Sequence, residues 1–304
     1  MINRNNGFEI FCEPGLDPET FKNEFLNKYR PVIIPNAFSD SGACRKWSLD
    51  YFAEQIPDMK FIAKHLDIMD QNTAAKMEEW EMGQYISALN QYASLNEQER
   101  KSTPRPPYCH DIPLFKLKPQ LIADMESFPT AFIPEFYQKN WWDYIQFFMS
   151  PKGSVTPLHF DSLCTHNLFF QVRGTKLFTI YPMEDWKHCY RYNWKWFEVD
   201  PENPDLDLHP EYTHASPIQV TVNSGDILLL PSGTMHHVRS LEESFSFNID
   251  FHTPESVTRA LCDLPADQPK EVYYYNSLIA LGLKADIPPE IVYPRYENYL
   301  FYTG

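Results

Sequence analysis

The feature that most constrains the fold is a series of short apolar segments between residues 142 and 251, separated by turns rich in glycine, proline and asparagine. Such a pattern is typical of a β-sandwich or a β-barrel. Arg173-Gly174-Thr175 separates two of the segments and predicts a hairpin between them. We expect strands over residues 144–149, 166–172, 176–181, 219–222, 227–230, 236–239 and 245–251.

Helical patterns flank this region on both sides. Asp17 followed by Pro18 predicts the start of a helix, because aspartate caps helices and proline suits the first turn. We also expect a strand over 31–35, a helix opening at 48–52, a helix over 72–100, and helices from Pro254 to about 283. The 304 residues therefore predict one domain, with a mixed helical part (1–104), a β core (105–253) and a helical C-terminal part (254–304).

Charge and cysteine content limit the classes of partner. The net charge of -15 disfavours nucleic acid as a partner, since no run of Lys or Arg offsets it. The six cysteines form no CxxC pair, which favours reduced thiols over disulfides or a zinc knuckle. The sequence has no signal-peptide pattern and no apolar stretch of roughly 18 residues. We therefore expect a soluble cytoplasmic protein that does not enter a membrane.

The segment Thr156-Pro157-Leu158-His159-Phe160-Asp161 carries the first sign of chemistry. Residues i and i+2 of a strand face the same side, so His159 and Asp161 point together and Phe160 points away. One imidazole and one carboxylate are two members of the facial triad that holds Fe(II) with open coordination positions. An HxD pattern alone is a weak signal. The alternative is that both are ordinary buried polar residues of a β-sandwich, each with its own partner.

A third ligand is expected from residues 225–238, where a turn, a buried strand and a second turn precede two histidines. This arrangement returns His236 across the barrel toward His159 and Asp161. His237 alternates with His236 on the strand, so we expect it to face away and to be structural. His166 is a further histidine in the core, but no carboxylate is spaced to support it as a ligand.

These motifs resemble the JmjC and cupin-like family of Fe(II)- and 2-oxoglutarate-dependent oxygenases. The pattern is most similar to the small hydroxylase branch that includes the asparaginyl hydroxylase of hypoxia-inducible factor. The resemblance covers most of the chain, from 30–35 and 46–48 through 156–161, 167–174, 225–231 and 236–241. It implies a double-stranded β-helix (jelly-roll) with flanking helices, and Fe(II), 2-oxoglutarate and O2 as cofactors. The family's metal triad falls on His159, Asp161 and His236.

The resemblance also implies a cosubstrate site. Lys176, just after the glycine turn, matches the family lysine that pairs with the distal carboxylate of 2-oxoglutarate, a charge-assisted contact. Thr156 and Tyr108 match residues that reach the same carboxylate, and Asn167 and Asn248 match polar positions near cosubstrate and metal. Two of these residues have a simpler interpretation: Lys176 could be a surface residue of a hairpin, and Thr156 could serve only to form a strand.

The resemblance implies hydroxylation of a C–H bond in an amino-acid side chain of a protein or peptide, with succinate and CO2 as coproducts. The alternatives are hydroxylation of a free amino acid or small metabolite, N-methyl-lysine demethylation, and a non-catalytic cupin-like binding module. Two positions depart from the family pattern: Met235 stands where an aromatic commonly precedes the distal histidine, and Ile249-Asp250 stands where an aromatic is frequent. Neither departure removes a metal ligand.

Two further segments carry predictions. The long insertion at 185–214 combines aromatic and acidic residues, so we expect it to frame the substrate entrance, to anchor itself on the barrel, or both. Arg239 is expected to form a structural ion pair. Members of the family often dimerise through C-terminal helices, which makes a homodimer through residues 255–304 the corresponding expectation.

Overall fold

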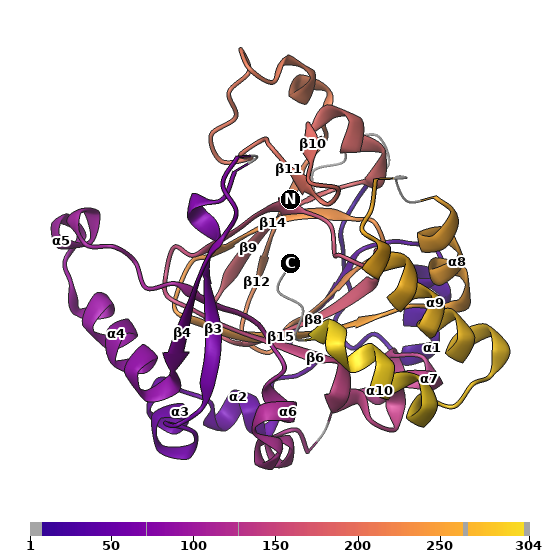
Figure 1. Ribbon diagram of the computed structural model, residues 1–304, viewed down its shortest axis with the longest axis horizontal. Coiled ribbons are helices and arrows are strands. Elements are labelled where there is room, and N and C mark those ends of the chain that lie inside the picture. The colour runs from indigo at the N-terminus through magenta and orange to yellow at the C-terminus, as the bar shows by residue number, and fades with distance from the viewer. Residues whose placement is uncertain (1–7, 71, 127, 264–266, 301–304) are drawn as a thin grey trace.

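The core of the protein is a pair of β-sheets that face each other (Figure 1). The structure is a computed structural model that describes residues 8–70, 72–126, 128–263 and 267–300. The nine-stranded sheet has the order β1 (Phe11–Cys12), β2 (Val32–Ile34), β13 (Ile227–Leu230), β8 (His166–Arg173), β15 (Ser244–Phe251), β6 (Ile145–Ser150), β5 (Tyr108–Ile112), β3 (Lys60–His65) and β4 (Lys76–Glu81). The six-stranded sheet has the order β10 (Arg191–Tyr192), β11 (Trp196–Phe197), β7 (Val155–His159), β14 (Met235–Ser240), β9 (Lys176–Tyr181) and β12 (Ile218–Val222).

The eight core strands are divided equally between the two sheets. β6, β8, β13 and β15 belong to the larger sheet, and β7, β9, β12 and β14 to the smaller one. Their pairings are antiparallel, and apolar side chains from both sheets meet between them, as Phe169 of β8 and Phe178 of β9 do with ring centroids 5.0 Å apart. This is the double-stranded β-helix, or jelly-roll, that was expected.

The hairpin predicted at Arg173-Gly174-Thr175 was wrong. β8 pairs with β13 and β15, whereas β9 pairs with β12 and β14, so this turn carries the chain from one sheet to the other. Gly174 has a φ of 74°, and a Cβ there would overlap the carbonyl oxygen of Glu243. Local strand and turn signals locate strand ends, but they do not distinguish a turn within a sheet from a turn between sheets.

The N-terminal part supplies both helices and additional strands. Asp17 caps α1 (Pro18–Thr20), which continues as η1 (Phe21–Leu26), and Ser48 caps α3 (Leu49–Gln55), as predicted. The helix expected over residues 72–100 was partly wrong. Its first section is β4, and the helices are α4 (Met82–Ser94) and α5 (Glu97–Ser102). Pairing with β3 overrides the helical propensity of the Glu-rich β4, whose charged side chains suit an outer strand.

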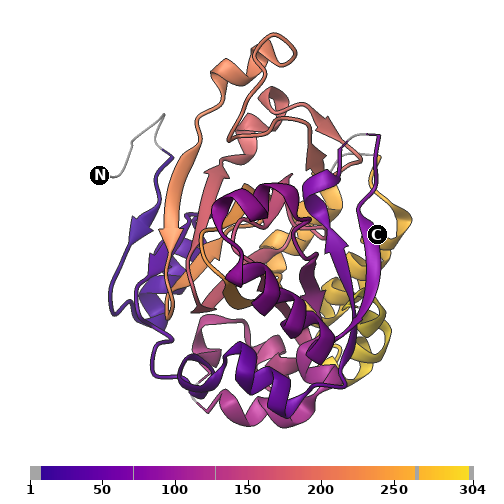
Figure 2. The same ribbon diagram turned by 90° about the vertical axis from the view of Figure 1, so that its left-hand side faces the viewer.

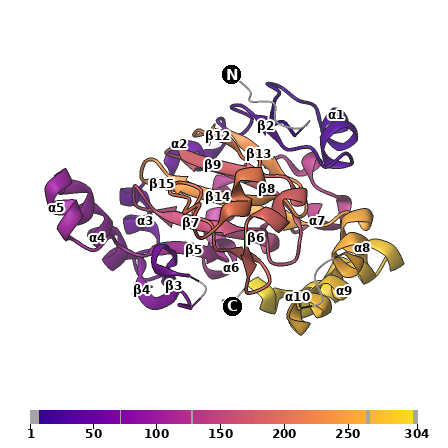
Figure 3. The ribbon, with the colours of Figure 1, turned by 90° about the horizontal axis from the view of Figure 1, so that it is seen from above.

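The remaining helices cover the flanks of the barrel. Figure 2 shows purple N-terminal helices in front of the strands, and Figure 3 shows α8, α9 and α10 grouped on the side away from α4 and α5. None of the helices in the described ranges is both long enough and apolar enough to span a bilayer. The other helices are α2 (Gly42–Lys46), η2 (Leu66–Ile68), α6 (Leu114–Leu117), η3 (Pro119–Asp124), η4 (Thr130–Phe132), α7 (Glu135–Gln138), η5 (Trp141–Tyr144), η6 (Met183–His188), η7 (Pro210–His214), α8 (Pro254–Cys262), α9 (Lys270–Ala285) and α10 (Pro289–Leu300).

Candidate metal centre and cosubstrate cavity

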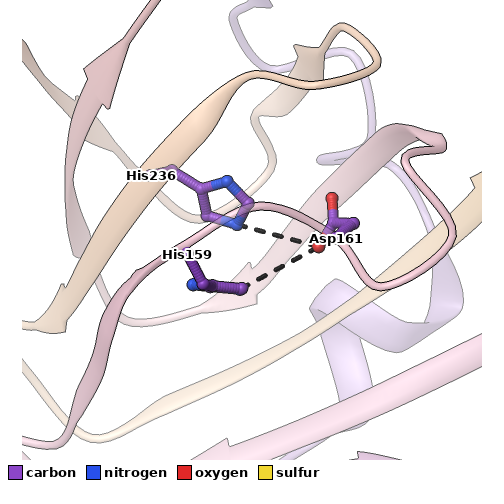
Figure 4. A group of neighbouring side chains, drawn as sticks. All are labelled: His159, Asp161 and His236. Carbon is purple, nitrogen blue, oxygen red and sulfur yellow. Dashed lines mark ion pairs between the residues drawn. The ribbon is translucent and has the colours of Figure 1, made fainter. Parts of the chain in front are cut away.

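His159, Asp161 and His236 meet at one point on the inner face of the smaller sheet (Figure 4). His159 is the last residue of β7, and its antiparallel register partner on β14 is His236, so the two imidazoles lie side by side with ring centroids 4.3 Å apart. Asp161 follows the end of β7 and turns Oδ1 to within 3.9 Å of the Nε2 atom of each histidine. One ligand atom from each residue lies within 4.8 Å of the others, the grouping that a single metal ion requires.

Hydrogen bonds around the triad leave the right atoms free to bind a metal. Nδ1 of His159 lies 2.8 Å from the Pro157 carbonyl oxygen, and Nδ1 of His236 lies 3.2 Å from that of Thr234. Because a carbonyl only accepts, each Nδ1 carries the proton and each Nε2 keeps a lone pair for a metal. Burial holds the pKa of His159 well below its usual range, which keeps that imidazole neutral. This donor set of two neutral imidazoles and one carboxylate fits Fe(II).

The neighbouring residues of the triad face away from it, as strand alternation predicts. Phe160 stacks on Trp186 with ring centroids 4.3 Å apart. His237 lies near Asp200 and Glu202 on the other side of β14. Asp200, Glu202 and His237 are a second group of possible metal ligands. Glu202 already forms an ion pair with Arg239, the structural ion pair expected for that arginine.

His166, another buried histidine, lies outside this site. Its side chain is fully buried, and its Nδ1 accepts a hydrogen bond from the backbone N–H of Ser232. It lines none of the cavities described here. The sequence-based preference for His236 over both other histidines therefore agrees with the geometry.

The triad opens onto a cavity of about 500 Å³, and a buried lysine also lines this cavity. Lys176 is 1% exposed, and its Nζ donates to the hydroxyls of Tyr108 and Ser246, each at 2.8 Å. No carboxylate of the described residues lies within ion-pair distance of it. Burial lowers the pKa of Lys176 to about 7. The interpretation as a surface lysine is therefore wrong, and the cavity contains a cation that lacks an anion.

This uncompensated lysine predicts a pH-dependent stability. The pKa of Lys176 is lowered in the folded protein, so between about pH 7 and its ordinary pKa the unfolded chain binds more protons. Stability should therefore rise with pH across that interval, and the rise should be smaller in Lys176→Met. Chemical denaturation of the metal-free protein at pH 7 and pH 9 measures it. Equal pH dependence of stability in both proteins would show that folding does not lower the pKa of Lys176.

The structure brings the other predicted residues into the same cavity. Tyr108, Thr156, Asn167 and Asn248 all line it. Asn167 donates from Nδ2 to Oδ2 of Asp161 at 3.2 Å, which orients the carboxylate. The side-chain carbonyl oxygens of Asn167 and Asn248 have no hydrogen-bond partner in the described structure, so both are available to a ligand.

Several residues in or beside the cavity were not predicted from the sequence. Ser246 precedes Asn248 by two positions on β15, so strand alternation would have placed it on the same face. Lys64, from β3, forms an ion pair with Asp111 at 2.9 Å, and Tyr299 reaches the cavity from α10. No local pattern could have identified Lys64 and Tyr299, since they come from flanking elements outside the β-helix.

The insertion over residues 185–214 both anchors itself and lines the cavity. Trp194 packs edge-on against Phe160 at 5.5 Å, next to the stacked Trp186. Tyr192, Lys195 and Trp196 line the cavity, and Trp196 packs on the His159 ring at 4.9 Å. The two alternatives for this insertion are therefore both supported.

Comparison with known proteins agrees with this architecture. The family model of the cupin-like domain matches residues 18–256. The chain is 25% identical over 245 residues to the 2-oxoglutarate and iron-dependent oxygenase JMJD4 of Gallus gallus, covering 75% of this chain and 56% of that protein. It is 29% identical over 251 residues to lysine-specific demethylase 8 of Danio rerio, covering 75% of this chain and 54% of that protein.

A third relative is the tRNA wybutosine-synthesizing protein 5 of Danio rerio, 26% identical over 264 residues that cover 79% of this chain and 74% of that protein. The chain thus spans about half the length of the first two relatives and about three quarters of the third. The matched region contains the β-helix and the complete triad. The chain belongs to the cupin-like domain family.

Proposed function

We propose that this protein is an Fe(II)- and 2-oxoglutarate-dependent dioxygenase that hydroxylates a C–H bond of an amino-acid side chain in a protein or peptide. The observation that carries the proposal is that a single cavity holds both a complete facial triad and a buried, unpaired lysine. His159, Asp161 and His236 would hold the iron. Bound there, iron would supply the oxidation of the substrate by O2, coupled to conversion of 2-oxoglutarate into succinate and CO2.

The residues of this chain bind and orient the reactants. Lys176 would pair with the distal carboxylate of 2-oxoglutarate, assisted by the Tyr108 hydroxyl that already contacts its ammonium at 2.8 Å. Thr156 lines the same part of the cavity, with its Oγ1 3.4 Å from Nε2 of His110. Asn167 would hold the Asp161 carboxylate in its ligating orientation through the hydrogen bond at 3.2 Å. The burial of these groups excludes water and strengthens each contact.

The charge of the protein bears on the class of substrate. A net charge of -15 favours a peptide or small cationic molecule over RNA, although one set of relatives is named for tRNA modification. Hydroxylation of a free amino acid and N-methyl-lysine demethylation use the same cofactors. A formaldehyde assay separates demethylation from stable hydroxylation, because only loss of an N-methyl group releases formaldehyde.

The test of the proposal is formation of succinate from 2-oxoglutarate. We expect turnover that requires Fe(II), stops with a chelator, and falls to background in Asp161→Ala, because the triad then loses its only carboxylate. Mass spectrometry of candidate peptides should show the addition of one oxygen atom. Absence of both iron binding and succinate formation would instead favour the non-catalytic binding module.

A homodimer through the C-terminal helices remains part of the proposal. α9 packs on both α8 and α10, so the three helices form one continuous unit beside the barrel. Size measurement of the chain with and without the segment after Pro254 tests it. An unchanged oligomeric state would exclude these helices as the dimer interface.

A further inference from the structure

One carboxylate of the cavity has no cationic partner. Asp250 lines the cavity and is 6% exposed. Its Oδ1 accepts a hydrogen bond from Nδ2 of Asn248 at 3.0 Å, and no other hydrogen bond to its side chain is found among the described residues. No Lys, Arg or His nitrogen of the described residues lies within 4.0 Å of it, as the ion pairs of the cavity show.

The other charged groups of the cavity already have a partner or a role. Lys64 pairs with Asp111, and Asp161 belongs to the triad. Lys195 donates to the Ser162 hydroxyl at 2.6 Å. Lys176 is assigned to 2-oxoglutarate under the proposed function. Asp250 is thus the buried carboxylate of this cavity that remains without a cation.

The position of Asp250 separates it from the cosubstrate anchor. Ser246, Asn248 and Asp250 alternate along β15 and all line or border the cavity, with Ser246 contacting Lys176. Four residues of extended strand span roughly 13 Å, so Asp250 lies beyond the reach of the carboxylate bound by Lys176. Its register partner on β8 is Asn167, which contacts Asp161. Asp250 therefore lies at the metal end of the cavity, where a substrate must approach.

Burying a carboxylate without a cation is energetically costly. Binding of a ligand that supplies the cation would therefore be favourable. Burial and the neighbouring Asp161 and Asp111 carboxylates raise the pKa of Asp250 well above its usual range, and Lys195 only partly opposes this. The raised pKa favours the protonated carboxyl group, and a bound cation would shift the balance back to the carboxylate. Asp70 at the exposed side of the cavity adds a negative charge that would attract a cation.

We infer that Asp250 is a specificity-determining residue that binds a cationic nitrogen of the substrate, an ammonium or guanidinium group. The inference rests on the proposed function, because it assigns the substrate class of the same cavity.

The test compares peptides that differ only in charge. Acetylated, amidated glycine pentapeptides with a central arginine or citrulline, and with lysine or norleucine, are titrated by calorimetry against the Zn(II)- and 2-oxoglutarate-loaded protein. Zinc is redox-inert, so binding is measured without turnover. We expect the wild-type protein to bind at least one cationic peptide about tenfold or more tightly than its neutral counterpart, the range of a charged hydrogen bond.

Asp250→Asn should remove this preference while leaving the affinity for the neutral peptides unchanged. The asparagine carbonyl can still accept the hydrogen bond from Asn248, so the local structure is retained. Asp143→Asn is the matched control, because Asp143 is a half-buried carboxylate outside this cavity; it should preserve the preference. A wild-type protein without charge preference would overturn the inference whether or not the variant folds. So would an undiminished preference in Asp250→Asn. Failure of the succinate assay alone would reject only the proposed function.

Discussion

Replacing His236 with alanine is expected to lower the Fe(II) affinity at least about 100-fold and to reduce succinate formation to background. The reason is geometric: Nε2 of His236 lies on the Asp161 side of β14, and its Nδ1 proton is held by the Thr234 carbonyl. Its loss leaves one imidazole and one carboxylate, too few protein ligands for a stable site. Equilibrium titration with Fe(II) under anaerobic conditions measures the affinity, and the succinate assay measures turnover.

The adjacent histidine provides the control. His237 is also buried, but it faces Asp200 and Glu202 on the opposite side of the strand. His237→Ala should therefore retain iron binding and turnover within a few-fold of the wild type, with any cost appearing in the unfolding temperature. If the two variants lost iron to the same extent, the assignment of the triad would be wrong.

The second large effect is expected for Lys176→Met, which should raise the KM for 2-oxoglutarate by about 10- to 100-fold. The lost contact is a buried, charge-assisted pair with the distal carboxylate of the cosubstrate. Methionine has a similar length and no charge, so it fills the position between the Phe148 and Phe169 rings that Lys176 now approaches at 5.4 and 5.2 Å. Iron affinity should not change, because Lys176 is not a ligand.

The unfolding temperature of Lys176→Met distinguishes loss of the cosubstrate contact from misfolding of the variant. Replacing a buried cation that lacks an anion by an apolar side chain of similar volume is often neutral or stabilising. We therefore expect Lys176→Met to unfold at the same or a higher temperature in the metal-free state, and Lys60→Met, the same change at an exposed position, to leave the KM unaltered. An unchanged KM in Lys176→Met would place the cosubstrate elsewhere.

Much of the site was predictable because it depends on local periodicity. Strand alternation placed His159 and Asp161 on one side, Phe160 on the other, and separated His236 from His237, and each placement agrees with the structure. The cosubstrate residues came from the family resemblance. Lys176 and Tyr108 are in contact at 2.8 Å although 68 residues separate them.

The errors and omissions have a common origin in long-range pairing. The turn at Gly174 was predicted as a hairpin but joins two sheets, and the Glu-rich β4 was predicted as helix but pairs with β3. Tyr299 was missed because it reaches the cavity from the last helix. Asp250 was noticed as a departure from the family, but its lack of a cation could be recognised only after every neighbouring charge had been placed.

By itself, the sequence determined where most strands begin and end, which face each side chain takes, and which three residues can bind a metal. These properties follow from a backbone repeat of two residues and from the chemistry of imidazole and carboxylate groups. Only the tertiary structure decided which strands pair, that Lys176 is buried without an anion, and that Asp250 faces the cavity without a cation. The physical reason is that pairing and electrostatic compensation depend on groups far apart in the chain, whose distances are set only when the two sheets close around the cavity.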